Sequence, residues 1–458
     1  MAAKQQGWIY AFSRSGQVSR QSVGTFDNGF MSIRQFLGLA SLLLLGPAWA
    51  QNPAGGAVSL QTALQAARNN LDVALARSNL AAARADVVSA NRAPLPVLTT
   101  KLSQMDLQNG IGGGNFMTEK RVDKSIGLDW TWERGNKREL RTLGAERAAS
   151  AAQADLDDIR TQQLLAVQAG FYDLLAAQER LVQIHQMERS AAQLAATAQK
   201  RLQAGDLAAQ DAARTEIEAQ RARADLQLAE LERQRAALLL WQVSGLTQAP
   251  EQLQAQPDWP ARNDDLAMAR SLDALVDARP DVRAAQARVD AAQAALDGSA
   301  ALRRSDITWG ASYDHYPGTS TAQIELRMQM PLQWGYNYQG EIARAGAQLA
   351  QANDLLDKVR RQARAELQRL QQEALNSAQR ARAYDSEILP RARQVAQGAE
   401  LAYSKGALSL TDLLDARRTL RATLLDALNA RADHAKAAGA WALRTQAELS
   451  AAAPAGQP

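Results

Sequence analysis

Two aspartates near the end of the chain, Asp412 and Asp415, have the type and spacing needed to act on a solute. They stand three residues apart at the start of a stretch with a helical pattern, so their carboxylates would share one helix face. Carboxylates that line a passage favour cations and resist anions. A second interpretation stays open, in which Asp412 caps the helix and Asp415 is a surface charge.

The aspartates follow a short segment that occurs twice in the chain. Three positions match at one offset of 201 residues: Gly205 with Gly406, Leu207 with Leu408, and Asp211 with Asp412. In each copy a glycine supplies the left-handed stop of one helix. A small or polar residue followed by a carboxylate then starts the next helix. Each copy is therefore predicted to be the tip of a long helical hairpin.

A second repeat surrounds the first. Residues 68–74 resemble residues 279–285, and each segment leads into an alanine-rich helical pattern. The two offsets are close to each other, so the chain is predicted to hold two homologous halves in tandem. The first half covers residues 51–262 and the second covers residues 263–448. The helical pattern at 137–204 contains no proline and would reach roughly 100 Å at 1.5 Å per residue.

Each half also contains two segments in which apolar and polar residues alternate, which predicts strands. They lie at about 96–106 and 121–133 in the first half, and at about 305–314 and 321–334 in the second. The apolar faces end in tryptophans such as Trp132 and Trp334, whereas Glu325 and Arg327 lie on a polar face. A strand of a soluble sandwich alternates too, but this pattern suits lipid on one side and water on the other.

Four strands are too few to close a barrel in a membrane, because the smallest such barrels have about eight. An unpaired strand edge in lipid is not tolerated. If the strands span a membrane, several copies of the chain must therefore share one barrel. The fold class is predicted to be mainly α with a β-barrel part.

Composition and charge limit which kinds of core, partner and covalent link the chain can have. Aromatic residues make up only 5%, which suits long helices that meet along narrow seams. The chain has a net charge of +4 and an isoelectric point of about 9.3, but most of the basic excess lies in the first fifty residues. The remainder is nearly neutral, so nucleic acid is not expected to be a partner. There is no cysteine, and hence no disulfide and no lipid anchor on a cysteine.

The start of the chain is typical of a secreted protein. Residues 31–50 contain Arg34, an apolar run at 36–45 and the small-residue sequence Ala48-Trp49-Ala50, which together predict a cleaved signal peptide. Residues 1–30 are interpreted as an over-long gene start or an unusual leader and are expected to be disordered or absent from the working protein. The tail at 449–458 is expected to be disordered.

Together these features resemble the TolC family of outer-membrane efflux proteins, along essentially the whole chain after the signal. The residues that carry the resemblance are the two glycine tips, Arg68-Asn69-Asn70-Leu71, Arg279-Pro280-Asp281-Val282 and Leu413-Leu414-Asp415-Ala416-Arg417-Arg418-Thr419-Leu420. The resemblance implies a homotrimer in which each chain gives four strands to a twelve-stranded barrel. It also implies that the helices form a periplasmic tunnel, and that a periplasmic adaptor couples its tip to an inner-membrane pump. Such a duct is not an enzyme and needs no cofactor.

The resemblance also assigns roles to residues at the tips. Asp412 and Asp415 match carboxylates that ring the constricted tunnel mouth, and three chains would multiply them into an acidic ring. Tyr403 and Asp211 match positions that help to hold the mouth closed. The family's arginine two residues past the second glycine is replaced by Leu408, so another arginine would have to act in its place. Contact with the adaptor is expected at Gly205, Leu207, Gly406 and Leu408.

Two segments, residues 132–138 and 338–345, are most similar to the heavy-metal efflux branch of the family, the CzcC type. Both lie where a strand passes into a long helix, so physically they are turn and cap signals. No metal site is expected, because His185, His315 and His434 are scattered and are interpreted as surface or interface residues.

Two other functions remain open at this point. A duct for type I protein secretion would differ only in its pump and cargo. A periplasmic coiled-coil scaffold would explain the helical hairpins but not the four strands. For the efflux duct, a pump of the resistance-nodulation-division type is expected, with the protein in the outer membrane of a Gram-negative bacterium and most of the chain in the periplasm.

Overall fold

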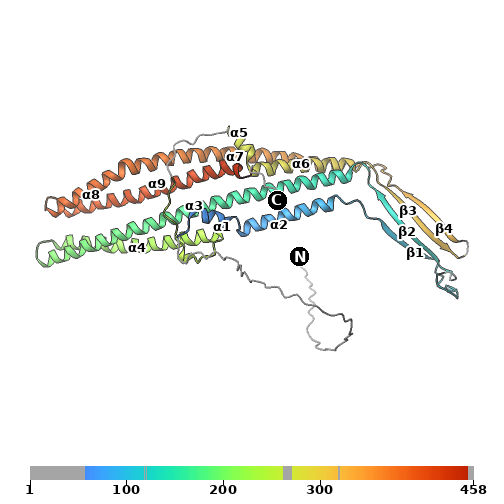
Figure 1. Cartoon of the computed structure of the whole chain (residues 1–458), viewed down its shortest axis with the longest axis horizontal. Coiled ribbons are helices and arrows are strands. Elements are labelled where there is room, and N and C mark those ends of the chain that lie inside the picture. Colours follow the sequence, from blue (N-terminus) through green and yellow to red (C-terminus); the bar gives the residue numbers. More distant parts are fainter. Residues whose placement is uncertain (1–56, 118, 120, 261–270, 318–319, 452–458) are drawn as a thin grey trace, which may run out of the picture. The chain divides into compact units, whose positions relative to one another are not determined.

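The computed structural model describes residues 57–117, 119, 121–260, 271–317 and 320–451. The proposed gene start and signal peptide therefore lie outside the described residues, as do the last seven residues of the chain. In the described part, the four strands lie at one end of the long helices. The tips of the two helical hairpins, where α3 meets α4 and α8 meets α9, lie at the other end (Figure 1). None of the described helices is both long and apolar enough to cross a membrane.

Each half of the chain contributes the same order of elements: two helices, two strands and a long helical hairpin. The helices of the first half are α1 (Leu60–Ala67), α2 (Leu71–Ala90), α3 (Lys137–Gln203) and α4 (Ala209–Ser244), followed by the short 3₁₀ helix η1 (Pro250–Gln252). The helices of the second half are α5 (Leu272–Ala278), α6 (Pro280–Ala301), α7 (Gln339–Ala383), the π-helix η2 (Tyr384–Ile388), α8 (Leu389–Ser404) and α9 (Leu410–Ala451). The predicted duplication is therefore present in the fold.

The long helices follow their sequence signals closely, but the first helix differs from the prediction. One helix was expected from Leu60 to about Arg92, and the structure has two, α1 and α2. The chain leaves the helix at Asn70, whose backbone is extended and whose side chain accepts a hydrogen bond from the N–H of Asp72. Asn70 also donates to the carbonyl of Val243 on α4 at 2.7 Å. A contact with a distant helix thus fixes a break that the local pattern does not reveal.

The turn signals at the start of the two long hairpins are confirmed. Asn136 precedes α3 and Tyr338 precedes α7, and both have left-handed backbone angles, with φ of +58° and +57°. The similar segments 132–138 and 338–345 therefore serve the same local purpose in the two halves, which is to turn the chain from the sheet region into a helix.

The sheet joins the two halves of the chain. Its strands are β1 (Val97–Ser103), β2 (Asp123–Trp132), β3 (Ile307–Tyr316) and β4 (Ser320–Gln329), in the order β1-β2-β3-β4 and antiparallel throughout. The central pairing is between halves, with Trp130 opposite Trp309. The outer strands β1 and β4 are the two edges of the sheet. An edge strand presents unpaired backbone groups.

The fourth strand is shorter than predicted. It was expected to continue to Trp334, but it ends at Gln329. Pro331 explains the difference, because proline has no N–H to donate to a neighbouring strand. At the C-terminus, α9 continues to Ala451, so residues 449–451, expected in a disordered tail, are helical.

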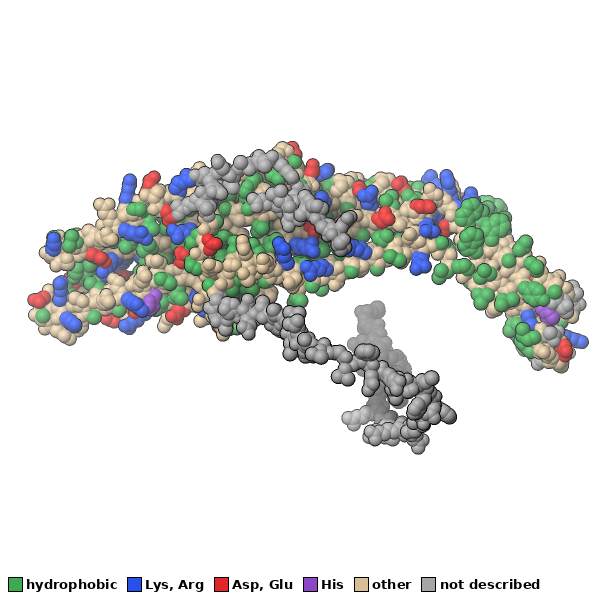
Figure 2. Space-filling view, in the orientation of Figure 1, with side chains coloured by type: hydrophobic (Ala, Val, Ile, Leu, Met, Phe, Trp, Pro, Cys, Tyr) green, Lys and Arg blue, Asp and Glu red, His purple; other side chains and the backbone are tan. Residues whose placement is uncertain are grey.

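The apolar face of the sheet is highly exposed in the single chain. The exposed fractions are 79% for Ile324, 81% for Leu326 and 52% for Trp130. Figure 2 shows hydrophobic side chains gathered over the strands, with charged side chains at the far loops and along the helices. An exposed apolar face of this kind marks a surface that contacts another protein or a membrane.

A π-helix interrupts the long helix of the second half. The segment η2 ends two residues before Pro390, which stands in the first turn of α8. Proline cannot donate to the carbonyl four residues earlier, and single π-turns are one way in which a helix absorbs such a defect. The kink expected at Pro390 therefore takes this form. Asp385 in η2 lies 3.5 Å from Arg431 of α9, which anchors the defect to the neighbouring helix.

Each half has its own apolar core. In the first half, Phe171, Leu174 and Leu240 are fully buried beside the connecting segment around Leu253. In the second half the core gathers α5, α6, α7 and α9 around Leu367 and its neighbours. The two helical groups pack against each other through α3, which contacts both α6 and α9.

A buried ionic network lies between the halves. Arg279 is 4% exposed and binds Asp281 at 2.7 Å and Glu366 at 2.8 Å. Arg444, whose side chain is 9% exposed, lies 3.2 Å from Glu366 and 3.3 Å from Asp158. Burial, and then the negative charge of Asp281, raise the pKa of Asp158 above its ordinary value. Arg279 and Asp281 belong to the repeated motif, so the motif serves to join α6, α7, α9 and α3.

Candidate channel mouth

The two hairpin tips have the same backbone geometry. Gly205 and Gly406 have φ of +81° and +75°, as the sequence predicts for left-handed helix stops. In both tips the amide of the residue after the glycine bonds back to a carbonyl of the last helical turn: Asp206 N to Arg201 O at 2.8 Å, and Ala407 N to Ala402 O at 2.9 Å. A Cβ atom on either glycine would meet open space, so backbone angle and not crowding requires glycine here.

Both aspartates of the expected ring are exposed in the single chain and lie in the first two turns of α9. Asp412 takes part in a helix cap: the Ser409 hydroxyl donates to its Oδ2 at 2.7 Å and accepts from its N–H at 3.2 Å. The cap residue of α9 is therefore Ser409, and the Asp412 carboxylate binds to it, which does not exclude a second role for Asp412. Asp412 and Asp415 are exposed, whereas Leu413 and Leu414 between them are buried.

The first tip reaches the second through an arginine that the sequence did not single out. Arg214 lies 3.7 Å from Asp211 on α4 and donates to the hydroxyl of Thr411 on α9 at 3.0 Å. Thr411 is the residue before Asp412. Asp211 therefore lies beside Arg214, the side chain that joins the first hairpin to the second.

Tyr403 bridges the hairpins in another way. Its ring packs partly buried on the apolar cluster that contains Leu410 and Leu194. The guanidinium of Arg201, from the other hairpin, lies 5.9 Å from the ring centroid, which is within the range of a cation–π contact. Leu207 and Leu408, which follow the glycines, are half-buried.

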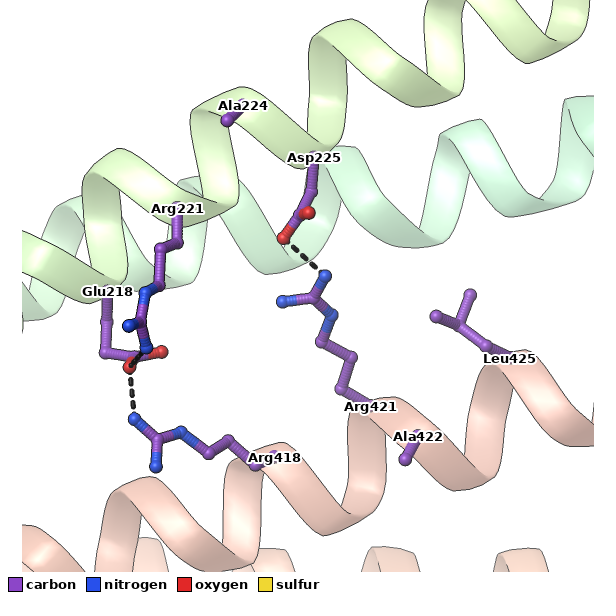
Figure 3. A pocket seen from close by; sticks show the side chains of 8 residues that line it. All are labelled: Glu218, Arg221, Ala224, Asp225, Arg418, Arg421, Ala422 and Leu425. Carbon is purple, nitrogen blue, oxygen red and sulfur yellow. Dashed lines mark hydrogen bonds and ion pairs between the residues drawn. The ribbon is translucent and has the colours of Figure 1, made fainter.

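Further up the hairpins, α4 and α9 are joined by ion pairs across a cavity of about 470 Å³. Arg418 binds Glu218 and Arg421 binds Asp225, with the pairs reaching across from opposite helices (Figure 3). Arg221 also lies 3.2 Å from Glu218. Long side chains thus span the space between these helices in place of close apolar packing.

The arginines of this bridge were missed as functional residues. Arg418 lies inside a segment that was singled out for its resemblance, but its partner Glu218 is 200 residues away in the sequence. The sequence does show a cluster of arginines after each tip glycine, because Arg214 and Arg221 follow Gly205, and Arg418 and Arg421 follow Gly406, all within 16 residues. Charge spacing on one helix does not identify a partner on another.

The described residues contain no group of three or more histidine, aspartate or glutamate side chains placed to hold a metal ion. His185 and His315 are half-buried, in the helical hairpin and at the end of β3. His434 is only 4% exposed, so of the two interpretations, surface or interface residue, the first does not hold in the single chain. It lies on the interior face of α9, where alanines surround it in the sequence.

Comparisons with known proteins agree in finding similarity to outer membrane efflux proteins. A family model described as outer membrane efflux protein matches residues 63–246. The cobalt-zinc-cadmium resistance protein CzcC of Cupriavidus metallidurans is 28% identical over 378 residues, which cover 80% of this chain and 85% of that protein.

Solved structures share the fold along most of the chain. The CusC channel is 18% identical with a TM-score of 0.71, over 84% of this chain and 91% of the other. A membrane protein from Pseudomonas aeruginosa is 17% identical with a TM-score of 0.73, over 84% and 93%. VceC of Vibrio cholerae is 16% identical with a TM-score of 0.69, over 84% and 95%. The hairpin tips and the shared four-stranded sheet agree with these comparisons, in which the chain is similar to outer membrane efflux proteins, which are channels and not enzymes.

Proposed function

We propose that three copies of this chain form a passive duct that carries divalent heavy-metal cations out of the cell through the outer membrane. The sheet supports the trimer: it has four strands, two open edges and an exposed apolar face. Three copies would supply twelve strands and leave no edge, whereas one copy falls below the roughly eight strands that a membrane barrel needs. The covering that the apolar face needs would then be lipid.

The cargo rests on one observation, which is the similarity to the cobalt-zinc-cadmium resistance protein over most of both chains. The exposed pair Asp412 and Asp415 is consistent with it. Three pairs in a ring at the mouth would concentrate cations and repel anions, without a fixed binding site that would hold the ion back. A passive duct has no need of the metal ligands that a storage or sensor site would use.

The partners follow from the same proposal. A periplasmic adaptor would dock on the tips at Gly205, Leu207, Gly406 and Leu408, and a pump of the resistance-nodulation-division type in the inner membrane would supply the energy. The open space around both glycines leaves room for a partner's helical hairpin. We also propose that residues 31–50 are removed on export and that no lipid anchors the mature chain, because it has no cysteine.

We propose that the bridges between the hairpins hold the mouth closed at rest. Arg214, bound to Asp211 and Thr411, would take the place of the arginine that the family has where this chain has Leu408. The contact of Arg201 with Tyr403 would add to it. An Arg214→Ala/Arg421→Ala variant is expected to raise single-channel conductance in lipid bilayers several-fold, because two links between α4 and α9 are lost. Arg283→Ala, at an exposed position far from the tips, serves as the control, and equal conductance in all three proteins would contradict the lock.

The proposed function is tested by metal tolerance. Deleting the gene in the source bacterium is expected to lower the tolerated concentrations of Co²⁺, Zn²⁺ and Cd²⁺ and to leave those of hydrophobic drugs unchanged. Complementation with the wild type should restore tolerance. Unchanged metal tolerance together with loss of a secreted protein from the medium would favour a type I secretion duct. A chain found in the periplasm and not in the outer membrane would favour the scaffold.

A further inference from the structure

One ion pair on the sheet spans an intervening strand. Asp129 on β2, Gly310 on β3 and Arg327 on β4 stand opposite one another in a single row. Arg327 Nη2 donates to Asp129 Oδ1 at 2.6 Å. The two residues are two strand spacings apart, or roughly 10 Å between backbones. The arginine side chain must therefore lie along the sheet, across β3, and not project from it.

Gly310 makes this path possible. A Cβ atom at this position would stand 2.3 Å from Asp129 Oδ1 and 3.2 Å from Arg327 Nη2. Any other residue would therefore block the pair or push the two side chains away from the sheet. The reason for glycine is space, because its backbone angles are those of an ordinary strand.

The adjacent row of paired residues, Thr99, Gly127 and Ser312, also favours an Arg327 side chain that lies along the sheet. Thr99 on β1 donates to the second carboxylate oxygen of Asp129 at 2.7 Å. Gly127 stands opposite Ser312, and a Cβ atom on Gly127 would lie 2.9 Å from the Ser312 Cβ. Small residues thus clear a shallow path in the middle of the polar face. Asp129 is 18% exposed, whereas the arginine that it holds is 45% exposed.

The polar face carries more negative than positive charge. Within the strands it presents four carboxylates, and it presents only two cations. The carboxylates are Asp123, Asp129, Asp314 and Glu325, and the cations are Lys101 and Arg327. If this face lines a water-filled lumen, as the exposed apolar face opposite requires, the lumen wall is acidic in every copy.

We infer that Asp129 is a positioning residue that holds Arg327 flat against the lumen wall across Gly310, so that the barrel stays wide and cation-selective. This inference rests on the proposed duct. Released from Asp129, three arginines would extend into one lumen, narrow it and add positive charge where cations pass. A cation filter in the barrel would then act in series with the one at the mouth.

The test compares ion flow through four proteins reconstituted in planar lipid bilayers: a parent chain with Asp129 and Arg327 unchanged, Asp129→Asn, Arg327→Gln and the double variant. All four carry Asp412→Asn and Asp415→Asn, so that the mouth contributes no carboxylates from this pair. Asp129→Asn is expected to lower single-channel conductance and the K⁺/Cl⁻ permeability ratio by about two-fold or more. In the Arg327→Gln background the same substitution should leave conductance unchanged, because there is no arginine to release.

Equal loss of conductance from Asp129→Asn in both backgrounds would overturn the inference, since the lost carboxylate alone would then explain it. Heat-sensitive trimers on gels would show that each variant is assembled, and Gly310→Ala should reproduce the conductance of Asp129→Asn. A wild type that forms no channel at all would overturn the proposed duct, and with it this inference. Channels with normal conductance in all four proteins would overturn the inference alone.

Discussion

Arg279→Met is expected to lower the free energy of unfolding by about 3–5 kcal/mol, the usual effect of removing one member of a buried ionic network. The guanidinium is 4% exposed and holds Asp281 and Glu366 together. Without it, the Asp281 carboxylate would remain partly buried with its charge uncompensated. Arg444 could still pair with Glu366, so the loss should fall on Asp281 and the start of α6. Thermal denaturation followed by circular dichroism in detergent measures the change.

Arg283→Met is the matched control for this prediction. Arg283 lies one turn further along α6 and is exposed, so the same change of side chain there should alter stability by less than about 0.5 kcal/mol. Similar melting temperatures for Arg279→Met and Arg283→Met would show that the network does not hold the two halves together. A hydrophobic replacement of the whole network is a different experiment, because it leaves no charge unpaired.

Asp412→Asn/Asp415→Asn is expected to lower the cation-to-anion permeability ratio of the channel by about ten-fold, because a trimer would lose six carboxylates from its mouth. Asparagine keeps the size of the side chain. At position 412 its amide oxygen can still accept a hydrogen bond from the Ser409 hydroxyl at the start of α9. Folding should therefore be little affected. The reversal potential across a salt gradient in planar bilayers measures the ratio.

Asp206→Asn provides the control for the acidic pair. Asp206 is an exposed carboxylate at the first tip, and its own N–H, which the substitution keeps, makes the bond that closes the turn. Its replacement should leave the permeability ratio close to that of the wild type. A ratio that falls equally in both variants would mean that the general charge of the tips, and not the paired aspartates, sets selectivity.

The sequence predicts the parts of this fold whose signals are local. Gly205 and Gly406 mark the tips because a left-handed helix stop needs glycine, and the long helices between them follow from an uninterrupted helical pattern. The strand alternation identifies all four strands. The duplication is visible because the two halves retain the same short turn signals.

The parts that could not be predicted depend on contacts between distant segments. Asn70 breaks a helix while it bonds to Val243, which no local pattern connects to it. Arg214 donates to Thr411 only because the fold brings α4 and α9 together. The path of Arg327 over Gly310 required the register of three strands. At each of these places, a residue's partner lies more than 170 positions away or on another strand.

The central claim, that three chains close one barrel, is tested most directly by cross-linking the two edges of the sheet. The chain has no cysteine, so Leu98→Cys on β1 can be combined in turn with Ile324→Cys, Leu326→Cys and Met328→Cys on β4. Within one chain these strands are three spacings apart, roughly 14 Å, which is too far for a disulfide. In a closed trimer, β1 of one copy would pair with β4 of the next. Oxidised outer membranes should then yield covalent trimers for at least one pair, whereas monomers alone for every pair would contradict the account.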